Sequence, residues 1–301
     1  VAASQREMKV PPAYPPDSMM RLTRVRPMKD LRKVTILWSL PGQRAKYRRK
    51  PLSILTSLLG DEGPKSVLSI LKARGLATAL SASKHTDTKN FCMVKVGISV
   101  TKLGFQEYPK VLQVLFDYIN MLHRIPPSDW KRISEEEQIL RDIMFRFKNK
   151  AKPYNYCYSL ARNLHYYDPK DVLSGGYLIH TCPDAQSIQE LLGYLTIENA
   201  MIQLIAKDVP LDPERTQTEP YYNTLFTTEK ISPDLVKQLK GDDAKGTTSA
   251  PNGSTTTTTS SSSSTSQGPY YLAIPPPNVF LPRDFSIKPQ DKAYDTKEEG
   301  G

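Results

Sequence analysis

Four histidines and three cysteines are the side chains of this sequence best suited to hold a metal or act as nucleophiles. They are His85, His123, His165, His180, Cys92, Cys157 and Cys182. The histidines are 38, 42 and 15 residues apart, whereas two zinc ligands on one helix face need a spacing such as H-E-x-x-H or H-x-x-E-H. The sequence also has no C-x-x-C pair, G-x-S-x-G, P-loop or G-x-G-x-x-G. Spacing alone therefore predicts no catalytic residue, no metal site and no cofactor in this chain.

Length and composition limit the class of protein. The chain has 301 residues, of which 39% are hydrophobic, and this is enough for one or two ordinary cores. No stretch approaches ~18 consecutive apolar residues, so neither a membrane span nor a membrane partner is expected. Three widely spaced cysteines favour reduced thiols over a disulfide framework, and no signal peptide is recognisable. These features favour a cytoplasmic location.

Positive charge is concentrated at the start of the chain. Residues 1–50 carry 13 basic and three acidic side chains, so their net charge of +10 equals that of the whole sequence. Such a segment attracts phosphate or acidic protein surfaces; alternatively, it is a solvated arm. Tyr47 is the only aromatic residue among the basic residues from Arg44 to Lys50, and no nucleic-acid motif follows. A polyanion is therefore a candidate partner of the arm, and nucleic acid is not expected.

The elements that would position these residues alternate between strands and helices. Strands are predicted at 32–40, 76–83, 91–100 and 200–206, with a polar hairpin loop at 84–90. Helices are predicted at 50–60, from Pro64 to Gly75, and at 101–122, 129–149, 155–165, 169–174 and 184–195. The helix at 129–149 is expected to bury Trp130, Ile133, Ile139, Leu140, Ile143 and Phe147, and to expose Glu135, Glu136 and Glu137. Strands interspersed with helices predict an α+β fold in which helices pack on one face of a sheet.

The sequence divides into four parts. Residues 1–30 form an extended, basic, Pro-rich arm, and residues 31–238 form the α+β domain. Residues 239–268 include 13 consecutive Ser and Thr residues from Ser254 to Ser266. This run has no apolar side chain to offset the entropy of ordering, so it is predicted to be a disordered insertion. Residues 269–301 are predicted to be an extended linker.

Several blocks of sequence resemble the pitrilysin family of zinc metallopeptidases (inverzincins), to which insulin-degrading enzyme and nardilysin belong. The longest block is PLSILTSLLGDEGPKSVLSILKARGLATAL at residues 51–80. Further blocks are PMKDLRK (27–33), FRFKNKAKPYNY (145–156), RNLHYYDPKDVL (162–173), EPYYNT (219–224) and the final IPPPNVFLPRDFSIKP. They occur in the order of the family's sequences and cover most of the chain.

The resemblance is to the second domain of the family, which repeats the fold of the first without the zinc ligands. It implies a mixed, mainly antiparallel sheet with helices packed on one face. It also implies that the chain alone is not catalytic, and that zinc is held by an H-x-x-E-H motif in a first domain of a longer parent. The chain would then form the wall of a chamber and anchor peptide substrates. Its partners would be peptides and the other domains of its parent.

The resemblance also implies a substrate-binding exosite, where the N-terminal stretch of a peptide adds to a sheet edge. Carried over by position, its residues are Ser57, Gly60, Glu62, Leu80, Ser81, Ala82 and Lys84. Small residues let a second backbone approach and pair, and a carboxylate can receive an α-ammonium group. The alternatives are that Glu62 compensates the dipole of a helix beginning at Pro64, and that Leu80 packs in the core.

This sequence departs from the family at the exosite. The family usually has a Gly-Gly pair at the positions of Ala82 and Ser83, Gln at Lys84, and His at Ser57 and Asp61. Added β carbons would narrow the approach, and Lys84 would repel a second positive group.

One further residue, Lys152, matches a basic position that binds anions and nucleotides in the family. The Lys keeps the charge but lacks the bidentate fork of Arg; alternatively, Lys152 is a solvated lysine at a helix end. Two other functions remain open for the chain. It could belong to a catalytically inactive relative that binds peptides or regulates a partner, or its basic arm could bind a polyanion.

Overall fold

A single mixed sheet organises the chain. The computed structural model describes residues 14, 18–240, 257–259, 270–282 and 284–286. The seven-stranded sheet has the order β3-β4-β2-β5-β1-β7-β6, and of its pairings only that of β1 with β5 is parallel. Its strands are β1 (Arg21–Arg26), β2 (Lys33–Pro41), β3 (Ala77–Asp87), β4 (Phe91–Val100), β5 (Ala200–Ile205), β6 (Gln217–Thr218) and β7 (Leu225–Lys230). The predicted α+β fold with a mainly antiparallel sheet is confirmed.

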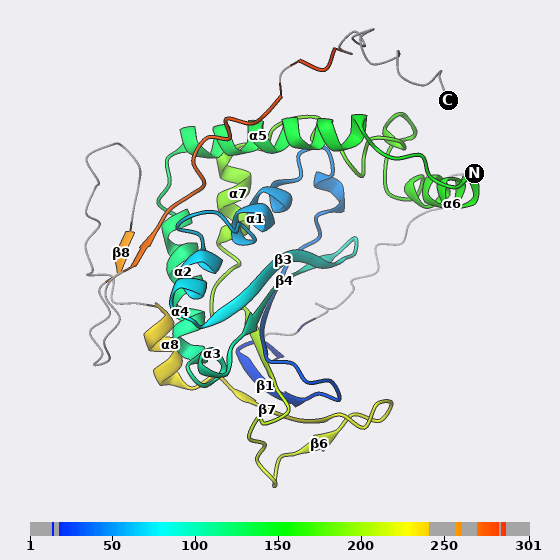
Figure 1. Ribbon diagram of the computed structural model, residues 1–301. Helices are drawn as coiled ribbons and strands as arrows, with labels where there is room; N and C mark the ends of the chain where they lie inside the picture. Colours follow the sequence, from blue (N-terminus) through cyan, green and yellow to red (C-terminus); the bar gives the residue numbers. More distant parts are fainter. Residues whose placement is uncertain (1–13, 15–17, 241–256, 260–269, 283, 287–301) are drawn as a thin grey trace, which may run out of the picture.

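The helices lie mainly on one side of this sheet (Figure 1). They are α1 (Pro51–Leu59), α2 (Val67–Ala73), α3 (Lys102–Gln106), α4 (Tyr108–Leu122), α5 (Pro127–Arg146), α6 (Pro153–Asn163), α7 (Ala185–Leu192) and α8 (Pro233–Lys240), with 3-10 turns η2 (Arg44–Lys46) and η3 (Pro169–Asp171). Helix α6 lies beyond one end of α5, away from the helices that cover the sheet (Figure 1). Within the described residues, no helix is long and apolar enough to cross a bilayer.

The core lies between the sheet and its helices. In β2, Val34, Ile36, Trp38 and Leu40 alternate along the strand and are all buried, as the period-two pattern of an inward-facing strand requires. Trp38 packs edge-on against Phe116 of α4, with ring centroids 6.2 Å apart. Burying side chains of this size contributes about 1.5–3 kcal/mol each. The sheet and helices are therefore a rigid support for whatever lies at the sheet's edges.

Several predicted boundaries differ from the structure. The second helix begins at Val67 rather than Pro64, because the side chain of Ser66 caps it by accepting a hydrogen bond from the Ser69 amide at 3.1 Å. The predicted helix at 101–122 is two helices, α3 and α4, because α3 ends at Gln106 and α4 begins at Tyr108 with Pro109 in its first turn. Strand β3 continues to Asp87, through most of the predicted loop at 84–90.

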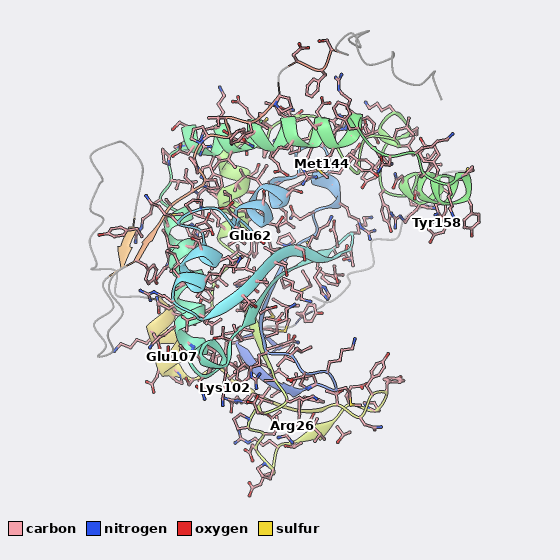
Figure 2. The ribbon with its side chains drawn as sticks, viewed as in Figure 1. Arg26, Glu62, Lys102, Glu107, Met144 and Tyr158 are labelled. Carbon is pink, nitrogen blue, oxygen red and sulfur yellow. The ribbon has the colours of Figure 1, made fainter. Side chains whose placement is uncertain are left out.

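The prediction of which α5 residues are buried is wrong in part. Trp130 and Ile133 are buried as predicted, but Ile139 and Leu140 are exposed and Phe147 is 64% exposed. The α6 helix has no buried residue at all. Figure 2 labels one exposed residue on each helix, Met144 on α5 and Tyr158 on α6. Two of the predicted solvent-facing carboxylates, Glu136 and Glu137, are instead partly buried in ion pairs with Arg132 and Arg141.

The basic start of the chain is paired within the fold. Strand β1 lies between β5 and β7, and Arg24 binds Glu229 across the β1–β7 pair. Four more cations of residues 21–50 also bind carboxylates from the second half of the chain: Arg32–Asp208, Lys46–Glu190, Arg48–Asp171 and Arg49–Asp184. These pairs reduce the charge that the described part of the arm offers to a polyanion, so this function stays a prediction without added support.

The last described segment returns to the helical layer. Strand β9 (Tyr270–Leu272) pairs with β8 (Thr257–Thr259), and Tyr270 donates a hydrogen bond to Asp117 of α4. Tyr270 and Leu272 are buried. The predicted disordered insertion at 239–268 lies mostly outside the described residues, as does the end of the predicted linker at 269–301, and the four-part division of the chain remains a prediction.

Candidate functional site

Strand β3 lies at one edge of the seven-stranded sheet. It pairs with β4 on one side, and in the described part of the chain no strand pairs with its other side. Along β3, Leu80 is 7% exposed, Ala82 is half-buried, and Ser81 and Ser83 are exposed. The alternation directs Leu80 and Ala82 toward the helices and the serines toward the opposite face. Small side chains thus accompany an unpaired backbone edge, which is the feature that strand addition needs.

The end of α1 and the loop after it lie beside this edge. A β carbon on Gly60, the C-cap of α1, would lie 3.6 Å from both the amide nitrogen and the β carbon of Ala82. Gly60 and Ala82 are therefore in close proximity, as the exosite prediction requires. Ala82 occupies space that a glycine would leave open, so the approach between loop and strand is narrowed at this point.

Glu62 is exposed on the loop between α1 and α2 (Figure 2). Its carboxylate lies 3.9 Å from the ammonium group of Lys72, and its side chain is 65% exposed. A surface ion pair of this kind contributes about 0–1 kcal/mol, so a second ammonium group can compete for the carboxylate. Because α2 begins at Val67 and is capped by Ser66, Glu62 does not occupy the first turn of that helix. The interpretation as a helix-dipole partner is therefore wrong.

The other predicted residues have separate surroundings. Ser57 is exposed and donates a hydrogen bond of 3.4 Å to Glu137 of α5. The side chain of Leu80 belongs to the core, so only its backbone faces the edge. The ammonium group of Lys84 lies 2.8 Å from the carboxylate of Asp87. Between Lys84 and Thr86 the register of β3 against β4 shifts, as at a β-bulge. The seven predicted residues thus follow α1 and β3 over some distance and do not converge on one point.

Next to Glu62, the carboxyl group of Asp61 is half-buried and accepts a hydrogen bond from the Gly63 amide at 3.2 Å. Burial raises the pKa of Asp61, although the backbone hydrogen bonds oppose this shift. Asp61 therefore holds the loop and is less available than Glu62 to an incoming cation.

Lys152 lies apart from this edge. It is the exposed N-cap residue of α6, and its side chain makes no cap hydrogen bond. The interpretation as a solvated lysine at a helix end agrees with this position. The described residues place no group of three His, Cys, Asp or Glu side chains where a metal could be held.

A cavity that the sequence did not predict lies where α1 begins and β3 ends. Its volume is about 410 Å³, and cations from η2, α1, β3, α5 and α6 line it: Arg44, Lys46, Lys50, Lys84, Arg141 and Arg162. Asp87 is its only acidic lining residue within the described part of the chain. The sequence signal was the basic run from Arg44 to Lys50, but the residues from the other elements are 34 to 112 positions away from Lys50 and carry no local pattern.

Comparison with known families identifies the fold. Residues 4–135 match the model described as the peptidase M16 inactive domain, and residues 145–299 match the model described as the middle or third domain of peptidase M16. The chain belongs to the peptidase M16 family. The resemblance seen in the sequence blocks is thereby confirmed. The two matched regions of this M16 chain meet in one sheet, because β1 of the first region lies between β5 and β7 of the second.

Individual M16 relatives support this assignment. The chain is 32% identical over 231 residues to the A-factor-processing enzyme of Saccharomyces cerevisiae, covering 76% of this chain and 22% of that protein. It is 26% identical over 277 residues to the insulin-degrading enzyme of Homo sapiens, covering 92% and 24%. The crystal structure of pitrilysin has the same fold, with a TM-score of 0.79, 22% identity and coverage of 97% of this chain and 28% of that one. The chain spans about a quarter of the length of these relatives.

Proposed function

We propose that this chain is the substrate-anchoring, chamber-forming part of a longer M16 zinc metalloendopeptidase, in which other regions supply the zinc and the catalytic residues. In this role the chain binds peptides without cleaving them. The family match to an inactive domain supports the division of labour, and the relatives, which include a putative zinc protease of Schizosaccharomyces pombe, support the kind of parent protein.

The observation that supports the anchoring role is the unpaired edge of β3, which lies beside the loop that holds Gly60 and Glu62. An extended peptide that pairs with this edge gains main-chain hydrogen bonds, which give affinity with little dependence on the peptide's sequence. Selectivity then requires a group that every peptide with a free N-terminus possesses. The exposed carboxylate of Glu62 receives the α-ammonium group in a charge-assisted hydrogen bond.

Binding of a short unstructured peptide labelled at its C-terminus tests this function. Affinities for the free and the N-acetylated peptide are measured by fluorescence anisotropy with the wild-type chain and with Glu62→Gln. Acetylation and Glu62→Gln are each expected to weaken binding by about tenfold, the worth of one charge-assisted hydrogen bond. Combined, they are expected to weaken it no further, because both remove the same contact.

The matched control is Glu135→Gln, which removes an exposed carboxylate on α5 that lies 3.9 Å from Lys131. It is expected to leave both affinities unchanged. Equal binding of free and acetylated peptides by the wild-type chain would contradict the anchoring role.

A further inference from the structure

The cavity between α1 and the end of β3 carries more positive charge than its surroundings neutralise. Of its six cations, Lys84 binds Asp87, while Lys46 and Arg141 bind Glu190 and Glu137 just outside the lining. The other three, Arg44, Lys50 and Arg162, have no carboxylate partner among the described residues. An excess of about three positive charges around one hollow is an electrostatic site for an anion.

The surroundings of Lys50 disfavour its charged form. Its ammonium group donates hydrogen bonds to the carbonyl oxygens of Tyr47 and Gly175, at 2.6 and 2.5 Å, but no carboxylate pairs with it in the described chain. Burial, and then the charges of Arg141 and Lys84, lower the pKa of Lys50 to about 8. An anion placed beside Lys50 would relieve this repulsion.

Two of the unpaired cations are fixed in place by neighbouring rings or carbonyls. Arg44 donates two hydrogen bonds to the carbonyl oxygen of Asp87, at 3.0 and 2.7 Å, and its guanidinium carbon lies 4.5 Å from the centre of the Tyr166 ring. Lys50 is fixed by its two carbonyl contacts. The cavity is therefore organised before any ligand arrives, which lowers the entropic cost of binding.

The cavity adjoins one end of the predicted peptide-binding edge. Lys84 belongs to both, and Thr56, which lines the cavity, is adjacent to Ser57 on α1. From Leu80 to Lys84 an extended strand covers about 13 Å, so a peptide paired along this edge reaches the cavity after about four residues.

We propose that this basic cavity receives an anionic side chain of the peptide that β3 binds, so that the chain prefers peptides with an acidic or phosphorylated residue a few positions after their N-terminus. This inference rests on the proposed anchoring function and adds a preference for one class of peptide. The carboxylate of Glu or Asp and the phosphate of phosphoserine share the required chemistry, since each accepts hydrogen bonds from Arg and Lys.

A positional scan tests the preference. Peptides with free N-termini carry a single Glu, Gln or phosphoserine at successive positions, and affinities are measured as before. The Glu peptide is expected to bind about five- to tenfold more tightly than its Gln counterpart when the residue stands at about positions 4 to 7, and equally at positions beyond the cavity's reach. Tighter binding of phosphoserine than of Glu would assign phosphate as the better ligand, and the reverse would assign the carboxylate.

Variants of the cavity separate it from general surface charge. Lys50→Met and Arg162→Gln are each expected to reduce the advantage of Glu over Gln to less than about threefold, while affinity for the Gln peptide stays the same. Lys237→Met, which removes an exposed lysine on α8 at the other end of the chain's helical layer, is the matched control and is expected to preserve the advantage.

The outcomes distinguish the two levels of the proposal. If acetylation weakens every peptide but Glu and Gln bind alike at all positions, the anchoring function holds and the cavity inference is overturned. If Glu helps equally at every position, or if Lys237→Met removes the advantage as strongly as Lys50→Met, the effect is general charge attraction and the inference is again overturned. If acetylation changes nothing, the anchoring function itself fails.

Discussion

Gly60 at the end of α1 lies against Ala82 of the edge strand β3, so that a β carbon on Gly60 would come within 3.6 Å of the Ala82 amide nitrogen. The same β carbon would lie 3.1 Å from the carbonyl oxygen of Thr56, which is tighter than an ordinary contact. The tightest limit at Gly60 is therefore the Thr56 carbonyl of its own helix, whereas the distance to Ala82 is an ordinary van der Waals contact. The methyl group of Ala82 forms the strand side of this contact.

Replacing Ala82 by glycine should widen the peptide-binding edge. We expect Ala82→Gly to bind a free-N-terminus peptide about two- to fivefold more tightly, because the change removes a methyl group that faces the loop at Gly60 and leaves more room there for the peptide. Glycine also loosens an edge strand, at about 0.5–1 kcal/mol. Ala79→Gly, at an exposed position of the same strand, carries that cost without opening the site. Fluorescence anisotropy measures the peptide affinity of both variants. Equal affinities would show that the methyl group of Ala82 does not restrict peptide binding.

Lys50 should make the free energy of unfolding depend on pH. Its pKa is lowered to about 8 from 10.5, so between these values the unfolded chain binds a proton that the folded chain lacks. The penalty for the charged ammonium is present below pH 8 and disappears as pH rises to about 10.5, so this group's contribution to stability increases with pH. Because the group is partly exposed, we expect the change to be about 1–2 kcal/mol.

Urea unfolding of Lys50→Met across this pH range measures the contribution. The variant also loses two hydrogen bonds, so the slope of its stability difference from wild type is informative and the absolute difference is not. That difference should shift by about 1–2 kcal/mol in favour of wild type as pH rises from 8 to 10.5. Lys237→Met, which removes an exposed lysine on α8, is the matched control measured under the same conditions. A flat difference for Lys50→Met would mean that the ammonium is not disfavoured in the fold.

The three thiols should react with an alkylating reagent at very different rates. Cys157 is exposed on α6, Cys182 is partly buried and donates to Gln138 at 3.2 Å, and Cys92 is fully buried in β4. Burial raises the pKa of Cys92 to about 12, which leaves about one thiolate in 10,000 at pH 8. Mass spectrometry over time should show modification of Cys157, then Cys182, with Cys92 reacting only in denaturant. Early alkylation of Cys92 in the folded chain would contradict its burial.

Two isoleucines of α5 should differ in their effect on stability. Ile133 is 8% exposed and Ile139 is 39% exposed, although both occupy apolar positions of the same helix. We expect Ile133→Ala to cost about 2–4 kcal/mol and Ile139→Ala to stay within about 0.5 kcal/mol of wild type. Chemical denaturation measures both, and each serves as the control for the other. Equal losses would show that Ile139 is covered in the folded chain.

Helices and strands whose apolar residues recur with the period of that element, about 3.6 or 2 residues, were predictable from the sequence. Strands β2 and β4, the helix α1 and the cap of α7 at Asp184 were predicted within a few residues. Each buries one face against the core, so hydrophobic spacing reports it directly. The edge position of β3 followed only from the family resemblance, because nothing within a strand shows which of its sides is paired.

Features that depend on distant residues could not be predicted. The sequence of β1, RLTRVR, looks like part of a solvated arm, and its place inside the sheet depends on backbone pairing with β5 and β7, which lie far along the chain. The apolar positions of α5 gave the correct helix but not its exposed second half, since periodicity does not show what lies opposite a face. The basic cavity escaped prediction because five separate elements contribute its cations.

The interleaving of β1 between β5 and β7 has a consequence for how the chain could be cut. A single backbone break at residues 147–152, between α5 and α6, would leave two pieces that still share one sheet and five ion pairs. Such a nicked molecule would stay associated under native conditions and separate only in denaturant, and the two pieces produced apart would behave as complementing fragments rather than as independent folding units.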